Sequence, residues 1–118
     1  MSEAQNRSAE FEEAKAIAEA CRQTSHDQAL SDFEMAKRQA EQANRERYER
    51  ARLAFERVKS DPTHSHYEKA RAELQAASQA GPDYRKAGDA LDAAIREVDE
   101  LYYEELARMS AEHGVGAR

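Results

Sequence analysis

The sequence predicts an all-α protein: an elongated antiparallel helical bundle of coiled-coil-like hairpins with about four helices, two short and two long. Ala, Glu, Lys, Arg and Leu make up about 55% of the 118 residues, a composition typical of long helices. Leu, Ile, Val and Phe make up only about 12%, a level that by itself is typical of disorder. These few apolar residues nevertheless recur every three or four positions, which places them on one face of a helix. Such a helical periodicity is not expected of a disordered chain. We therefore expect residues 1–118 to form a single helical domain.

The first two helices are expected at 8–23 and 26–60. In the first, apolar side chains share one face, namely Phe11, Ala14, Ile17, Ala18 and Cys21. Ser25 and Gln28 have the spacing of a capping box and would begin the second helix, whose apolar positions run from Leu30 to Val58. The segment between the two contains no Gly or Pro, so one continuous helix of about 50 residues is the alternative. We prefer the break.

The last two helices are expected at 63–80 and 83–113, followed by a frayed tail at 114–118. Pro62 suits a first helical turn, and Ser65 and Glu68 form a second possible capping box. Gly81 is a good left-handed terminator, and Asp83 is placed to cap the fourth helix.

Residues 48–62 have an aromatic and small-residue spacing that ends in Asp61 and Pro62: Tyr48, Ala51, Phe55 and Val58. This stretch resembles the second helix of a tetratricopeptide repeat, which would imply stacked helical repeats. That family separates its two helices by a turn, whereas residues 44–47 contain no breaker. We therefore prefer a continuous helix here.

In an up-and-down bundle the helix at 63–80 is shorter than its neighbours, so the helix at 83–113 would overhang and leave apolar surface uncovered. The residues that we expect to bind a partner form an apolar patch with an acidic rim: Leu101, Tyr102, Tyr103, Leu106, Met109, Glu100, Glu104 and Glu105. Because the Ala-rich faces would bury little area, we expect this patch to form a homodimer.

Several classes of function are disfavoured. The longest apolar runs are two or three residues, so we expect no membrane span, no membrane partner and, with no secretory signal, a cytoplasmic protein. The sequence lacks the glycine-rich loops with which nucleotide-binding enzymes hold phosphate groups. We expect no catalytic residues and no cofactors. Cys21 falls on an apolar face and is expected to be a buried thiol. Asp61, His64 and His66 form the cluster whose side chains are best suited to bind a metal ion. Their spacing does not place them on one face of a helix, so we expect no metal.

The charge pattern leaves two possibilities open. The net charge is −6, which opposes direct binding to nucleic acid, and the acidity is concentrated in residues 82–118. Residues 45–59 are locally basic, so the two regions could lie together and neutralise each other, or the acidic surface could be functional. We expect a non-enzymatic interaction module, an adaptor, chaperone or inhibitor of unknown protein partner. The alternative is an acidic inhibitor, of the kind mobile elements encode, that occupies the basic nucleic-acid-binding surface of a host protein.

Overall fold

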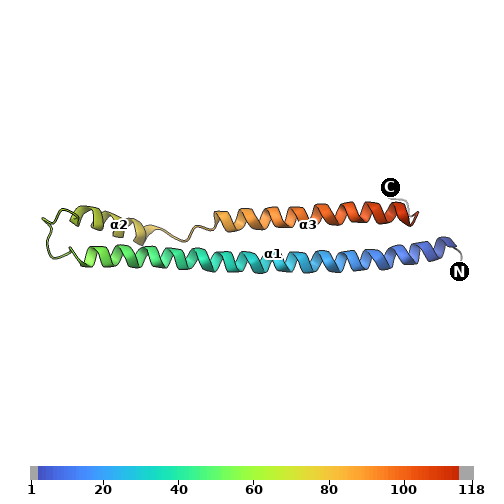
Figure 1. Ribbon diagram of the computed structural model, residues 1–118, viewed down its shortest axis with the longest axis horizontal. Helices are drawn as coiled ribbons and strands as arrows, with labels where there is room; N and C mark the ends of the chain where they lie inside the picture. Colours follow the sequence, from blue (N-terminus) through green and yellow to red (C-terminus); the bar gives the residue numbers. More distant parts are fainter. Residues whose placement is uncertain (1–2, 115–118) are drawn as a thin grey trace. The chain divides into compact units, whose positions relative to one another are not determined.

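The protein contains three α-helices in the part of the chain that the computed structural model describes, residues 3–114 (Figure 1). They are α1 (Glu3–Glu56), α2 (Tyr67–Gln79) and α3 (Arg85–Glu112). No strand occurs within these residues. The all-α prediction is confirmed, whereas the count of four helices is wrong. The predicted frayed tail lies, apart from Gly114, outside the described residues.

The predicted break near Ser25 is absent, because α1 continues through it. Nothing in the segment removes a backbone hydrogen bond, and a break would leave several N–H and C=O groups without helical partners. Side chains there instead make contacts along the helix: the Thr24 hydroxyl donates to the Ala20 carbonyl at 3.1 Å, and the Gln23 amide donates to Asp27 at 2.9 Å. The helices predicted at 8–23 and 26–60 are therefore one. Because α1 also continues through residues 44–47, the helix pair of a tetratricopeptide repeat does not form there.

The chain divides into two compact units, and α1 contributes to both. Unit 1 comprises Met1–Phe33 and Gly88–Arg118, and unit 2 comprises Glu34–Ala87. In unit 1, α3 lies antiparallel to the first part of α1, and in unit 2, α2 lies beside the last part of α1 (Figure 1).

Unit 1 has a thin core between two helices. Its buried apolar side chains are Phe11 and Ala29 of α1 and Tyr102 and Met109 of α3. Phe11 also contacts the ring of His113 at 6.2 Å between centroids. Among the described residues no side chain of either unit is less than 2% exposed. Two helices alone can bury only the narrow stripe that each turns toward the other, so neighbouring rows stay accessible.

Unit 2 is held mainly by alanines, which allow close approach of the helices. Its buried residues are Ala51, Val58, Ala70, Ala77 and Ala87. The rings of Phe55 and Tyr67 pack beside them at 5.6 Å between centroids.

The turn between α1 and α2 is longer than predicted. Residues 57–66 form successive turns, in which the backbone N–H and hydroxyl of Thr63 both donate to the Asp61 carboxylate. Residue His66 takes the N-cap position, so the capping box predicted at Ser65 does not start the helix.

The boundary between α2 and α3 corrects one predicted terminator. Asp83, predicted to cap the fourth helix, lies two residues before Arg85, the first residue of α3, and accepts a hydrogen bond from its backbone N–H at 3.0 Å. Gly81 does not adopt the left-handed conformation, since Gly114 is the one described residue with positive φ. Residue Ala80 ends α2 in an extended conformation instead. Pro82 further disfavours helical geometry at the residue directly before it, Gly81.

Candidate interaction surface

An apolar groove runs along unit 1 where α1 and α3 lie side by side, and we call it the α1–α3 groove. Its volume is about 530 Å³. The α1 wall consists of small and aliphatic side chains together with Arg22: Ala14, Ile17, Ala18, Cys21, Arg22 and Ser25. The α3 wall is apolar in its first half and charged toward its end: Val98, Leu101, Tyr102, Glu105, Arg108, Met109, Glu112 and His113.

The groove exists because large residues are buried below it and small residues line its α1 side. Tyr102 and Met109 are 9% and 5% exposed and form its floor. Ala14 and Ser25 are too small to fill the space above them. The largest aliphatic residues of the two walls, Ile17 and Leu101, are 62% and 58% exposed. The groove therefore leaves substantial apolar surface in contact with solvent.

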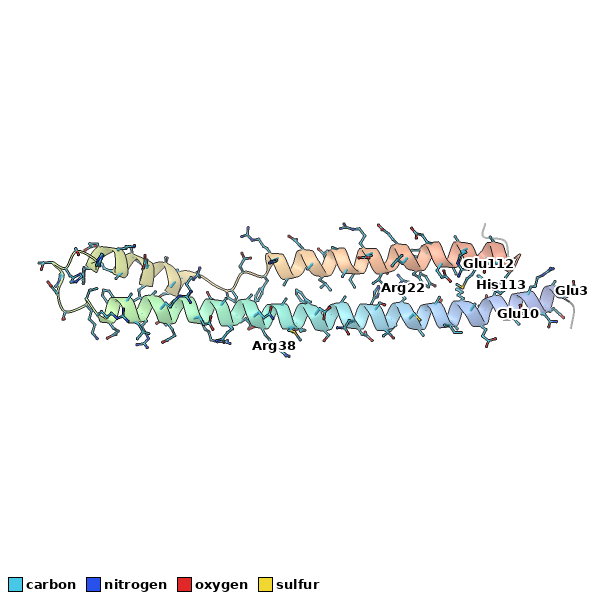
Figure 2. The ribbon with its side chains drawn as sticks, in the orientation of Figure 1. Glu3, Glu10, Arg22, Arg38, Glu112 and His113 are labelled. Carbon is cyan, nitrogen blue, oxygen red and sulfur yellow. The ribbon has the colours of Figure 1, made fainter. Side chains whose placement is uncertain are left out.

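A polar cluster bridges the two helices at one end of the groove. Arg22 lies between α1 and α3 (Figure 2), and its Nε donates to Asp99 Oδ1 at 2.9 Å. His26 Nε2 lies 2.8 Å from the same oxygen. The Arg22 guanidinium and then His26 hold the pKa of the Asp99 carboxyl below its usual range. Tyr102 adds a hydroxyl that donates to Glu19 at 3.3 Å. This cluster fixes the register of α3 on the first part of α1.

The other end of the groove carries excess negative charge. Arg108 forms ion pairs with both Glu105 and Glu112, so one guanidinium faces two carboxylates. The Arg108 hydrogen bond lowers the pKa of Glu105. His113, at the end of α3, lies beside Glu10 of α1 (Figure 2), with 3.9 Å between Nδ1 and Oε2.

The residues predicted to bind a partner fall into separate environments. Four of them line the α1–α3 groove: Leu101, Tyr102, Glu105 and Met109. Three others line a second hollow on α3: Glu100, Tyr103 and Glu104. Leu106 is half-buried. The buried positions of Tyr102 and Met109 show that the first part of α1 covers α3, so the overhang from which the patch was predicted does not occur.

Sequence reasoning missed the α1 side of the groove. Ile17 and Cys21 were expected in the core, and both are exposed. The prediction of a buried thiol at Cys21 was therefore wrong. The signal that could have identified this row is its width: residues 11, 14, 17, 18 and 21 span more of the helix circumference than one partner helix can cover.

The two units carry opposite charge. The sequence of unit 1 contains 15 acidic and six basic residues, a formal net charge of −9, whereas that of unit 2 contains nine acidic and 12 basic residues, +3. The acidic α3 lies beside the acidic first part of α1, since Asp99 pairs with Arg22 and His113 approaches Glu10. The basic residues 45–59 belong to unit 2. Neutralisation of α3 by this basic stretch, one of the two possibilities left open by the sequence, is therefore not observed within either unit.

The histidines at the turn of unit 2 do not form a metal site with other ligands. His64 Nδ1 accepts a hydrogen bond from the backbone N–H of His66 at 3.0 Å. That nitrogen is therefore engaged within the turn. Across residues 3–114, no group of three His, Cys, Asp or Glu side chains could hold a metal ion. In the same range no helix combines the length and the apolar character that crossing a membrane requires.

Comparison of the chain with protein-family models, with curated proteins and with solved structures gave no match.

Proposed function

We propose that the protein is a non-enzymatic protein–protein interaction module that binds an amphipathic helix in the α1–α3 groove. The observation that carries this proposal is the exposure of Ile17 and Leu101, 62% and 58%, on the two walls of one groove. Exposed aliphatic residues gathered in a concave surface are typical of a binding site, whereas scattered ones are not.

The dimensions of the groove suit a helix. Its α1 wall runs from Ala14 to Ser25, which at 1.5 Å per residue is a length of about 18 Å, or about three helical turns. A helix laid in such a groove presents apolar residues at i, i+3, i+4 and i+7. Complete burial of an aliphatic side chain contributes about 1.5–3 kcal/mol, so covering the exposed surface of Ile17 and Leu101 would contribute about 1–2 kcal/mol each.

The ionisable side chains of the groove support binding better than catalysis. Asp99, beside the groove, is ion-paired with Arg22, and Glu105 with Arg108, and the pKa of each carboxyl is lowered by its arginine. A general acid or base works best with a pKa near the operating pH, so carboxylates held in the ionised form are poorly suited to proton transfer.

A displayed library of 18-residue helical peptides tests this proposal. We expect selection on the whole chain to enrich peptides with apolar residues at i, i+3, i+4 and i+7. The double variant Ile17→Ser/Leu101→Ser should lose these peptides, whereas Leu30→Ser/Leu53→Ser should keep them, because both leucines are 48% exposed and lie outside the groove. Equal enrichment on wild type and on the groove variant would rule out the groove as the binding site.

The charge of unit 1 favours one second candidate, the acidic inhibitor that occupies a basic nucleic-acid-binding surface. A net charge of −9 over this unit gives a strong negative field. Such an inhibitor would act through exposed carboxylates such as Glu97, Glu100 and Glu104. Its binding would weaken on reversal of these charges and in high salt, and would survive Ile17→Ser/Leu101→Ser.

The homodimer stays a prediction from the sequence. It was based on an uncovered end of the helix at 83–113, and in the structure the first part of α1 covers Tyr102 and Met109. Its remaining support is the thin core of unit 1.

A further inference from the structure

We infer that the occupant of the α1–α3 groove is a cationic amphipathic helix of another protein, and not a second copy of this chain. The inference rests on the proposed function and adds the chemistry of the partner. Three observations carry it: the carboxylates around the exposed apolar residues, the excess charge at one end of the groove, and the net charge of the unit.

Both exposed apolar residues have carboxylates as neighbours along their helices. Glu13 lies four residues before Ile17, and Glu97 and Glu105 lie four residues before and after Leu101. On a helix, residues four apart are neighbours on the same face. No basic residue occupies an i±3 or i±4 position relative to either Ile17 or Leu101. A helix seated on these two side chains therefore has carboxylates at the margins of both walls. The two arginines that line the groove, Arg22 and Arg108, are each already paired with carboxylates of the protein.

These carboxylates are not all neutralised within the protein. Glu13 and Glu97 form no ion pair with any other described residue, and both are exposed. At the end of the groove, Arg108 offsets only one of the two charges of Glu105 and Glu112. Lysine or arginine side chains at the edges of a bound helix would pair with these groups, since interfaces place opposite potentials together.

The same charges oppose a second copy in this groove. Two copies that joined through their grooves would bring together two units of −9 each. Like charges that face each other across an interface disfavour association strongly. Covering the apolar surface with a partner of opposite charge avoids this cost.

Three synthetic 18-residue peptides test the inference. They share one Leu face at i, i+3, i+4 and i+7 and differ only in their polar positions, which are all Lys, all Gln or all Glu. Binding of each labelled peptide to the whole chain is measured by fluorescence anisotropy in 50 and 300 mM NaCl. We expect the Lys peptide to bind at least tenfold more tightly than the Gln peptide at low salt, with the Glu peptide weakest. The advantage of Lys should shrink at high salt.

Two double variants, each of which removes two carboxylate charges, test whether the position of the charge determines binding of the Lys peptide. Glu13→Gln/Glu97→Gln neutralises the carboxylates next to the exposed apolar residues, and we expect it to weaken binding of the Lys peptide at least fivefold. Glu12→Gln/Asp92→Asn removes the same charge from positions turned away from Ile17 and Leu101, and we expect a change of less than twofold. Ile17→Ser/Leu101→Ser, which keeps all the charge, should also weaken binding at least fivefold. A Lys peptide with scrambled sequence should bind more weakly than the amphipathic one.

The outcomes separate the two proposals. If the Gln or Glu peptide binds as tightly as the Lys peptide, the groove binds helices but the inference about charge is wrong. If no peptide binds, both proposals fail. If the two charge-neutralised pairs behave alike, the Lys peptide recognises only the net charge and the inference is overturned. Sedimentation velocity of the chain alone tests whether a second copy of the chain occupies the groove. Self-association that Ile17→Ser/Leu101→Ser abolishes would show that it does and would overturn the inference.

Discussion

Replacing Met109 and Leu101 by alanine, one at a time, tests the orientation of α3. Both belong to the patch that the sequence predicts, yet Met109 is 5% exposed and Leu101 is 58% exposed. Truncation of a buried Met or Leu to Ala costs about 2–5 kcal/mol. We expect Met109→Ala to lose about 2–3 kcal/mol, near the lower end, because side chains beside an open groove can move toward the space created.

Leu101→Ala should cost about 1 kcal/mol or less. Only about two-fifths of Leu101 is removed from solvent, and the loss scales with the surface already buried. Met and Leu have similar helix propensities, so the change in propensity is nearly the same in the two variants and cancels in the comparison. The expected difference between them is about 2 kcal/mol.

The measurement is urea unfolding followed by circular dichroism at 222 nm, with thermal melts on the same samples. At about 4 °C per kcal/mol for a chain of this size, Met109→Ala should lower Tm by about 8–12 °C and Leu101→Ala by no more than about 4 °C. If the two variants lose equal stability, or if Leu101→Ala loses more, α3 does not face α1 through the row that contains Met109.

Three further variants or treatments test the rest of the structure. Asp99→Asn should lower Tm at neutral pH, because it breaks the pairs with Arg22 and His26. Since the folded-state pKa of Asp99 is lowered, its contribution to stability is present above the unfolded pKa of about 3.9 and is lost as pH falls through the folded pKa. The Tm difference from wild type should therefore shrink between pH 4 and 2, and a constant difference would contradict this pairing. Ser25→Pro should cost about 3 kcal/mol in urea unfolding if α1 is continuous, whereas Ser25→Ala should not; tolerance of proline would restore the predicted break. Cys21 should react with a thiol reagent in the folded protein within a few-fold of its rate in urea, and protection in the folded state would show that the groove is closed.

Local signals in the sequence located both ends of the last helix and the end of the helix before it. The helices predicted to end at 80 and to span 83–113 are observed as Tyr67–Gln79 and Arg85–Glu112, and Asp83 accepts a hydrogen bond from the first backbone N–H of α3. The prediction failed at Ser25, where a capping box was taken as a helix start. Such a motif satisfies free N–H groups only where a helix begins, and within a helix the same residues are tolerated. In the absence of Gly or Pro, the continuous hydrogen bonding of α1 is the more stable outcome.

The residues that line the α1–α3 groove were only partly predictable from the sequence. Leu101 and Glu105 were chosen because they lie on an acidic helix with apolar residues, and both line the groove. Ile17 and Cys21 were assigned to a core, because the phase of apolar residues shows which residues share a face but not how much of that face a partner covers. In a unit of two helices the outer row stays exposed.

The sequence by itself determined that the chain is helical, because helix propensity, caps and the phase of apolar residues act over a few neighbouring positions. Only the tertiary structure decided which segments lie together. Pairing α3 with the first part of α1 gathers 15 acidic and six basic residues in unit 1, and leaves the basic stretch 45–59 in unit 2. The physical reason is that Ala-rich faces are nearly interchangeable as partners, so the choice among them depends on a few specific contacts far apart in the sequence, such as Arg22 with Asp99 and Phe11 with His113.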